Sequence, residues 1–335
     1  MSERGCVITG WGSALPPTVV ANADLESILD TSDEWIVERS GVRTRRAATG
    51  PFVSIDPPGH PPGGVGTTAA LAIEAARRAL DCSGTRPDEI GFLLLCTTTP
   101  DQVMPATSSA VAGVLGIDGG AVDLNAACAG FSYGLITAAG IVATGARKVL
   151  LIGAETMTRT LDWQNRTNAF LFGDGAGALV LEAVNGPGSL LGWDAGVDGT
   201  LVDLLYVDHG SGMIMKGPEV FRRAVRATVD SANAALKVAG VGAEEIALFI
   251  PHQANQRIME AIADRVGIAA ERIVSVIDWT GNTSSASIPL ALVDAVEHGR
   301  LTPGDVVLFA GFGAGMTWSS VVWRWNPDAA DVPEL

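Results

Sequence analysis

Apolar residues along this chain form two alternating patterns, and the alternation predicts strands that are followed by helices. Unbroken apolar runs of about four to eight residues are typical of strands buried on both faces. Apolar positions that recur every three or four residues are typical of amphipathic helices. The predicted strands cover residues 6–12, 90–97, a run ending near 124, 148–153, 246–250 and 306–310. The predicted helices cover residues 23–37, 67–80, 105–115, a stretch from 129, 225–236, 258–266 and a stretch from 288.

The order of these elements recurs in the second part of the chain at a nearly constant distance. About 156 residues separate Leu80 from Leu236 and also Ile90 from Ile246, at matching places in helix and strand. Such a constant offset indicates an internal duplication. We therefore expect two similar halves, residues 1–184 and 185–335. Alternation of strands and helices further predicts mostly parallel sheets that helices cover on both faces.

Composition and charge narrow the class of protein. The chain has 335 residues and a formal net charge of −15, which argues against nucleic acid as a general partner. The first residues do not form a signal peptide, and no run approaches the roughly 18–20 apolar residues of a membrane span. The four cysteines lack CxxC spacing and form no metal pattern with the four histidines. We expect a cytoplasmic protein with free thiols, no bound metal and no membrane contact.

Cys128 lies where the strand that ends near Leu124 gives way to the helix that begins near Ala129. The unpaired N–H groups and positive end of a helix favour a thiolate, so this position predicts a lowered pKa for the cysteine. The small neighbouring residues would let a bulky substrate approach the sulfur. A buried and inert cysteine is the alternative, because most free cysteines simply fill space in protein cores.

The second half of the chain supplies polar groups that suit a cysteine nucleophile. His252 directly follows a predicted strand, and Asn282 lies in the small polar loop Gly281–Ser287. The glycine-rich loop Gly311–Thr317 follows another strand and offers backbone N–H groups with little side-chain cover. Ligands bind where parallel strands end, so these groups and Cys128 together predict a catalytic site. Taken singly, each of them is also an ordinary turn residue.

Several separate motifs, in order along the chain, resemble those of the β-ketoacyl-acyl carrier protein synthase III family within the thiolase superfamily. The matching segments are Thr31–Ile36, Asn125–Phe131, Phe172–Gly177, Pro251–Asn255, Gly281–Ser287 and Gly311–Trp318. The resemblance runs from about Val7 to Trp325. It implies an α/β fold of five layers, αβαβα, built from two duplicated halves, and a homodimer.

The resemblance also implies a catalytic triad of Cys128, His252 and Asn282 that performs a decarboxylating condensation. Cys128 would take an acyl group from an acyl-CoA, which is a substrate, so no cofactor is implied. Malonyl-acyl carrier protein would then lose CO2, and His252 and Asn282 would donate hydrogen bonds to the enolate. The N–H groups of Cys128 and Ala314 would form the oxyanion hole, and Phe312 would keep water from the malonyl carboxylate.

Matching positions further imply where the two substrates bind. Trp35 and Arg166 would lie around the adenine of CoA, and Arg39 around its phosphates. Arg257 would meet an acidic helix of the carrier protein. Judged from the residues alone, the four arginines at positions 39, 43, 45 and 46 are either a phosphate clamp or a solvated surface. The basic residues at 222, 223 and 226 either extend this rim or form a solvated helix face.

The acyl pocket departs from the pattern of the family. The resemblance assigns to it Phe221 and, from the partner subunit, the residue at the position of Met104. The segment between Tyr206 and Met215, which usually helps to wall this pocket, is shortened, and residues 51–66 form an unusually long, proline-rich loop. A more open pocket favours a larger acyl chain over acetyl, in fatty acid or polyketide biosynthesis. The motifs leave open the chain length, the carrier protein and a housekeeping or specialised role.

Two other functions compete with condensation. One is an acyltransferase on the same scaffold, which moves an acyl group to an alcohol or amine in specialised metabolism. Asn282 argues against it, because an enolate-stabilising carboxamide serves chiefly decarboxylation. The other is a catalytically silent subunit that binds a carrier protein or a partner synthase, against which the intact triad argues.

Overall fold

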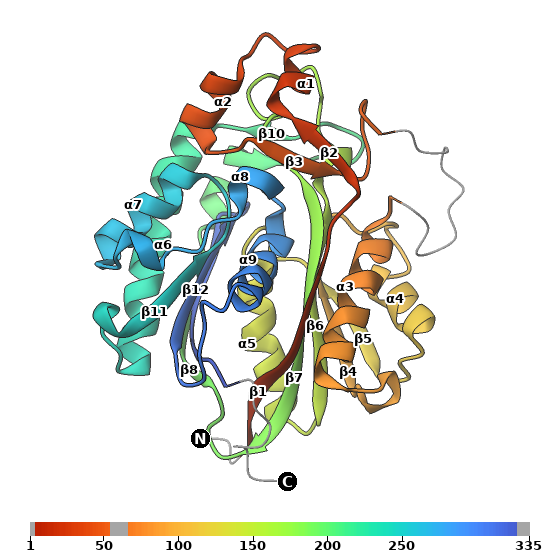
Figure 1. Ribbon diagram of the computed structural model, residues 1–335, viewed down its shortest axis with the longest axis vertical. Helices are drawn as coiled ribbons and strands as arrows, with labels where there is room; N and C mark the ends of the chain where they lie inside the picture. Colours follow the sequence, from red (N-terminus) through yellow and green to blue (C-terminus); the bar gives the residue numbers. More distant parts are fainter. Residues whose placement is uncertain (1–3, 54–65, 327–335) are drawn as a thin grey trace.

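The computed structural model describes residues 4–53 and 66–326, and two β-sheets dominate it (Figure 1). The first sheet has the strand order β1-β7-β6-β4-β5. β4 pairs in parallel with β5 and β6, whereas β7 runs antiparallel to both β6 and β1. The strands are β1 (Arg4–Ala14), β4 (Phe92–Cys96), β5 (Gly120–Leu124), β6 (Lys148–Thr156) and β7 (Asp174–Asn185).

The second sheet repeats this arrangement with the order β11-β12-β13-β8. β11 and β12 are parallel, and β13 runs antiparallel to both β12 and β8. Where the first sheet has β5, the second has only an isolated parallel bridge between Phe249 and Ile273. The strands are β8 (Leu190–Val197), β11 (Ile246–Pro251), β12 (Val306–Gly313) and β13 (Thr317–Arg324). The repeated strand order supports an internal duplication, while the proposed boundary between residues 184 and 185 stays a prediction.

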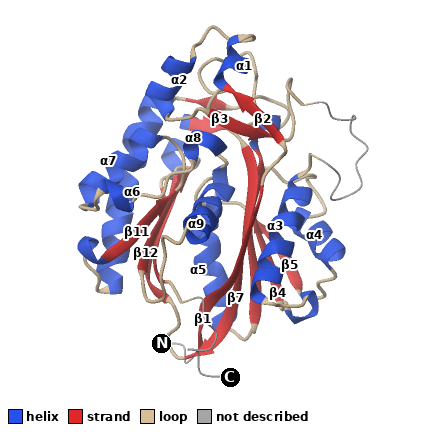
Figure 2. Cartoon of the chain, in the orientation of Figure 1, coloured by secondary structure: helices blue, strands red, loops and turns tan. Residues whose placement is uncertain are grey.

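Helices complete a five-layered αβαβα arrangement, which confirms the expected fold (Figures 1 and 2). α3 (Thr68–Ser83) and α4 (Thr107–Leu115) cover the outer face of the first sheet. α6 (Gly217–Ala239) and α7 (Gln256–Val266) cover the outer face of the second. α5 (Gly130–Ala143) and α9 (Ser287–Glu297) lie between the two sheets.

Short elements gather at one end of the molecule, at the top of Figure 1. They are α1 (Asn22–Glu26), α2 (Asp33–Ser40), α8 (Ile277–Thr280), the antiparallel strand pair of β2 (Thr18–Ala21) and β3 (Thr44–Ala47), and the hairpin of β9 (Leu205–Tyr206) and β10 (Ile214–Met215). Turns of 3₁₀-helix cover Pro87–Glu89, Met157–Thr160, Gly199–Leu204, Ala243–Glu245, Ala270–Arg272 and Ser284–Ala286.

One expectation about these elements is wrong. The sheets are mixed rather than mostly parallel, because β7 and β13 return beside their neighbours without a crossover helix. The helical stretch over residues 23–37 is divided into two helices, α1 and α2, and the second begins directly after its N-cap, Ser32. Most of the proline-rich loop, residues 54–65, lies outside the described residues.

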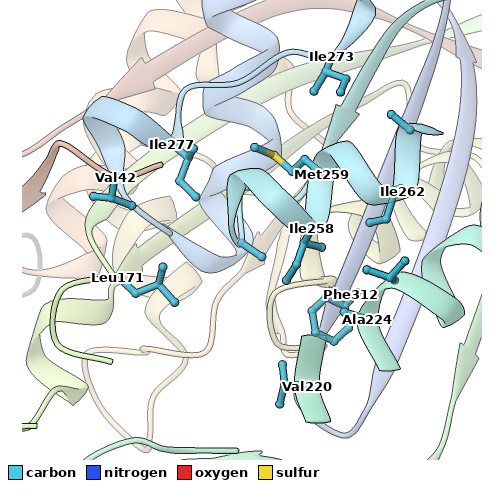
Figure 3. Close-up of a cluster of buried hydrophobic side chains, with 14 of the residues drawn as sticks. Val42, Leu171, Val220, Ala224, Ile258, Met259, Ile262, Ile273, Ile277 and Phe312 are labelled. Carbon is cyan, nitrogen blue, oxygen red and sulfur yellow. The ribbon is translucent and has the colours of Figure 1, made fainter. Parts of the chain in front are cut away.

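The second sheet packs against α6 and α7 through one continuous apolar cluster (Figure 3). Val220 and Ala224 of α6 and Ile258 of α7 surround Phe312 at the end of β12. This packing fixes the end of β12 beside the site described below. Within residues 4–53 and 66–326, none of the helices is both long and apolar enough to cross a membrane.

Candidate active site

Cys128 lies in the turn between β5 and α5 and is almost fully buried. The preceding residue, Ala127, has a φ of 48°, a left-handed backbone conformation that residues other than glycine rarely adopt. Gly313 of β12 lies directly against this turn, because a Cβ atom added there would be 2.5 Å from the backbone nitrogen of Cys128. Only glycine at position 313 allows the two halves of the chain to meet this closely around the sulfur-bearing residue.

His252 lies one residue beyond β11, and its position is fixed from two sides. Its backbone N–H donates to the carbonyl of Ala310 at 2.8 Å, which ties it to β12. Its Nδ1 is 2.7 Å from the hydroxyl of Ser287 at the start of α9. Its Nε2 is buried and has no hydrogen-bond partner in the described part of the chain. The imidazole is therefore anchored through one nitrogen and open to a substrate through the other.

Asn282 is held through its backbone and through its side chain. Its N–H donates to the carbonyl of Leu171 at 2.8 Å, and its carbonyl accepts from the N–H of Gly173 at 3.0 Å. Its Oδ1 accepts from the N–H of Ser284 at 2.9 Å. Because Oδ1 is engaged in this way, the NH2 group of the carboxamide remains to donate to a substrate.

One cavity of about 850 Å³ joins these groups. Cys128, His252, Asn282 and Phe312 line its inner part, and the remaining predicted residues that line it are Trp35, Arg39, Arg166, Phe221 and Arg257. Ala314 follows Gly313 in the turn between β12 and β13. Met104 does not line this cavity in its own chain, and its side chain is 80% exposed on the loop before α4.

Burial controls the protonation of the two titratable groups. It raises the pKa of the Cys128 thiol to about 12, with the Glu155 carboxylate adding to the increase and the Ser284 hydroxyl opposing it. The expected lowering of this pKa by the helix end is therefore wrong, since desolvation of the thiolate outweighs it. Burial also lowers the pKa of His252 to about 3. In the free protein at neutral pH, a thiol faces a neutral imidazole.

Trp35 forms an aromatic platform at the outer part of the cavity. The guanidinium carbons of Arg39 and Arg166 lie 4.6 and 5.4 Å from its ring centre. The ring of Phe170 packs edge-on against it, with 5.3 Å between centroids. Two cations around a flat ring suit a planar group that carries phosphates. Arg257 lies at the start of α7, where its N–H donates to the N-cap residue Asn255 at 2.9 Å.

The other arginines divide between the alternatives left open by the sequence. Arg45 is completely buried, so it cannot belong to a surface phosphate clamp. Arg222 and Arg223 both pair with Glu219 on the exposed face of α6, as expected for a solvated helix face. Of the four clustered arginines, only Arg39 lines the cavity.

Two supporting groups escaped the sequence analysis. Ser287 and Ser284 belong to a segment that its composition singled out, yet nothing in their spacing shows that they contact His252 and Asn282. The segment Phe170–Phe172, which lines the cavity and holds Asn282, gave no signal of its own beyond its place beside a glycine-rich motif.

Most of the chain resembles known proteins in sequence. Residues 122–199 match the family 3-oxoacyl-[acyl-carrier-protein (ACP)] synthase III, and residues 236–325 match the C-terminal part of that family. A β-ketoacyl-[acyl-carrier-protein] synthase III of Brucella suis is 44% identical over 333 residues, which cover 95% of this chain and 99% of the relative. One of Erythrobacter litoralis is 45% identical over 331 residues, covering 95% and 98%.

Solved structures resemble the whole fold. The 3-oxoacyl-[acyl-carrier-protein] synthase III of Aquifex aeolicus has a TM-score of 0.89 and 39% identity, covering 96% of this chain and all 100% of that one. The priming β-ketosynthase of the R1128 polyketide biosynthetic pathway has a TM-score of 0.87 and 36% identity, covering 98% of both chains.

Proposed function

Because this chain belongs to the 3-oxoacyl-[acyl-carrier-protein] synthase III family, we propose that it condenses an acyl group from an acyl-CoA with malonyl-acyl carrier protein. The products are a β-ketoacyl carrier protein, CO2 and free CoA, and the reaction starts a fatty acid or polyketide chain. One observation carries the proposal. A thiol, an imidazole and a carboxamide meet in a single cavity whose outer part carries Trp35 and two cations.

In the first step, the acyl group moves from CoA to the sulfur of Cys128. The thiol is protonated at neutral pH, because its pKa is raised to about 12. It needs a base, and the neutral imidazole of His252 offers Nε2. The Ser287 hydroxyl can accept a hydrogen bond from Nδ1, which leaves Nε2 as the acceptor. The thiol proton passes through His252 to the sulfur of the departing CoA.

In the second step, the malonyl group loses CO2 and its thioester oxygen gains negative charge. The Ser287 hydroxyl can instead donate to Nδ1, so that Nε2–H of His252 becomes a donor to this oxygen. The NH2 group of Asn282 is the second donor. Removing one donor of this kind typically raises the barrier by about 3 kcal/mol.

The enolate carbon then attacks the acyl carbonyl on Cys128. The N–H groups of Cys128 and Ala314 hold the resulting oxyanion. When this oxyanion collapses, the C–S bond breaks and the Cys128 thiolate leaves, and it takes up one proton from solvent. Phe312 shields the malonyl carboxylate from water. No cofactor takes part, because the acyl-CoA supplies its group as a substrate.

The aromatic and basic residues that line the outer part of the cavity divide between the two substrates. Trp35 and Arg166 bind the adenine of CoA, and Arg39 binds its phosphates. Arg257, on the rim at the start of α7, meets the acidic surface of the carrier protein. Electrostatic attraction of this kind chiefly speeds encounter and weakens with salt.

The working unit is a homodimer in the cytoplasm. β5 is one of the two edge strands of the first sheet, and Val122 on it is 43% exposed. Val103 and Met104, on the loop that leads to α4, are 87% and 80% exposed. Apolar side chains at an uncovered strand edge are typical of a surface that pairs with a second copy. In such a pair, Met104 of one subunit completes the acyl pocket beside Phe221 of the other.

The acyl chain is larger than acetyl. Leu205 and Met215 of the short β9–β10 hairpin line the cavity. Few residues connect these two strands, so little chain is available to close the cavity from this side.

The test is intact-protein mass spectrometry after mixing the enzyme with acyl-CoAs from two to about twelve carbons, then with malonyl-carrier protein. We expect a mass gain on the wild type that Cys128→Ala lacks, strongest with chains longer than acetyl. Malonyl-carrier protein should then remove the acyl group as a β-ketoacyl product with release of CO2.

Two outcomes contradict the proposal in different ways. An acyl group that malonyl-carrier protein leaves in place but an alcohol or amine removes identifies plain acyl transfer. A strong preference for acetyl-CoA leaves condensation intact and contradicts only the larger acyl chain.

A further inference from the structure

Arg45 is a buried cation that the proposed reaction does not use. Its side chain on β3 has 0% exposure. Within the described residues it makes no ion pair, and its guanidinium instead donates to three neutral oxygens. These are the carbonyl of Val20 at 3.0 Å, Oδ1 of Asn22 at 2.7 Å and the carbonyl of Phe170 at 2.8 Å.

Such a site is costly to maintain. A buried charge loses its hydration, and this loss is offset by the three hydrogen bonds and by the attraction of the nearby carboxylates of Asp24 and Asp33. Burial lowers the pKa of Arg45 to about 10, so the side chain still carries its charge at neutral pH. Asn22 also links Arg45 to a carboxylate, because its Oδ1 accepts from Arg45 while its Nδ2 donates to Asp33 at 2.7 Å.

The third hydrogen bond of Arg45 holds the segment that pairs with the backbone of Asn282. Arg45 fixes the carbonyl of Phe170, and the next carbonyl, that of Leu171, accepts from the N–H of Asn282 at 2.8 Å. Two residues further on, the N–H of Gly173 donates to the carbonyl of Asn282 at 3.0 Å. The segment that Arg45 fixes thus holds both backbone groups of Asn282.

Arg45 also packs against both sides of this pairing. A Cβ atom added to Gly173 would lie 3.2 Å from the Cβ of Arg45, and one added to Gly281 would lie 3.1 Å from it. Gly281 directly precedes Asn282 and has a φ of 65°. The stem of Arg45 therefore packs against the glycines beside Asn282, while its guanidinium holds the neighbouring segment.

We propose that Arg45 is a positioning residue that sets the carboxamide of Asn282 for decarboxylation of the malonyl group. The inference rests on the proposed function, in which Asn282 acts in decarboxylation and takes no part in acylation of Cys128. It predicts that a change at Arg45 separates the two half-reactions, although the side chain itself does not line the cavity.

The test is Arg45→Lys, which keeps the charge but loses the planar fork that reaches three oxygens. Decarboxylation of malonyl-carrier protein should fall about 10- to 100-fold, the range expected when a catalytic group is misplaced by about 1 Å. Acylation of Cys128 by acyl-CoA should change less than about two-fold, because it does not use Asn282. Arg46→Lys is the matched control on the same strand and should leave both rates unchanged, since among the described residues the Arg46 guanidinium donates one hydrogen bond, to the carbonyl of Pro16 at 3.3 Å.

Asn22→Ala is a milder second variant in case Arg45→Lys does not fold. It removes one of the three bonds of Arg45 at a residue outside the cavity. Decarboxylation should again fall more than acylation, by a smaller factor. Equal losses in both half-reactions, in step with a lower Tm, would mean a structural role only and would overturn the proposal.

A crystal structure of Arg45→Lys gives a readout that does not depend on the reaction. We expect the Asn282 carboxamide to shift while Cys128 and His252 stay in place. An unmoved carboxamide contradicts the positioning role. If the wild type does not decarboxylate malonyl-carrier protein, the proposed function fails, whereas the crystal structure still decides whether Arg45 positions Asn282.

Discussion

Cys128 illustrates how burial decides the chemistry of a single residue. The start of α5 follows it closely, and a helix end on its own stabilises a thiolate. Yet the side chain is nearly inaccessible, and the Glu155 carboxylate disfavours a second negative charge nearby. The pKa of the thiol is therefore raised, so Cys128 needs a base to remove its proton before it can attack a substrate.

This raised pKa predicts how Cys128 reacts with iodoacetamide. The thiolate is the nucleophile, and below the pKa its fraction grows about ten-fold with each pH unit. Alkylation should therefore be slow at pH 7 and keep rising up to at least pH 9.5, without a plateau. The measurement is the rate of mass gain across this pH range in a Cys82→Ser background, because Cys82 is exposed.

The matched control is Cys82→Ser combined with Cys128→Ala, which should gain almost no mass because Cys6 and Cys96 are buried and, unlike Cys128, do not line the cavity. A plateau below pH 8 in the Cys82→Ser protein would show a thiol that ionises near neutrality. That result would contradict burial as the dominant influence on Cys128.

At the scale of elements, helix starts place the site residues. The N-cap of α2 is Ser32, whose side chain accepts from the N–H of Trp35 at 3.2 Å. It ends at Gly41, whose φ of 84° suits glycine at a helix C-terminus. The first turn of this helix thus fixes the ring of Trp35, which lines the cavity.

Ser32→Ala tests this link between a helix cap and substrate binding. Losing an N-cap hydrogen bond costs about 1 kcal/mol of stability and loosens the first helical turn. The KM for acyl-CoA should rise several-fold, while kcat stays nearly constant because Trp35 does not touch the reacting atoms. Steady-state kinetics with varied acyl-CoA measure both values.

Thr67→Ala provides a matched control. Thr67 is the N-cap of α3 and accepts from the N–H of Ala70 at 3.0 Å, but it does not line the cavity. A similar loss of Tm with an unchanged KM is expected. A KM that rises equally in both variants would mean that the effect follows stability rather than the position of Trp35.

At the scale of the whole molecule, the site exists only where the two halves meet. The first half contributes Cys128 after β5, and the second contributes His252 after β11 and Asn282 before α9. The hydroxyls of Ser132 on α5 and Ser319 on β13 meet at 2.5 Å across the same contact. The halves therefore have to pack closely before the three groups share one cavity.

Val122→Lys tests the proposed dimer. A charged side chain on the free edge of β5 would be buried without a partner if two copies pair there. We expect a monomer by sedimentation velocity at micromolar concentration, together with weaker loading of long acyl chains. Val238→Lys is the control, because Val238 is 66% exposed on α6 and away from this edge. A Val122→Lys protein that sediments like the wild type would contradict the proposed interface.

The sequence by itself determined much of this protein. Local patterns predicted β1, β4, β5, β6, β11, β12 and most helices, because apolar periodicity reflects which faces a segment buries. They did not predict the strands β7, β8 and β13. The constant offset between the halves predicted the duplication, and the motifs indicated the family and the triad. Cys128, His252 and Asn282 could be identified from the sequence because each belongs to a distinctive local segment.

Only the tertiary structure decided what depends on contacts between distant segments. Ser287 supports His252 from 35 residues away, and Arg45 reaches Phe170 from 125 residues away. The direction of β7 and β13 and the raised pKa of Cys128 likewise follow from neighbours in space. Burial and side-chain direction arise when the whole chain packs, so the sequence could not separate Arg45, which holds the segment that pairs with Asn282, from the three arginines near it.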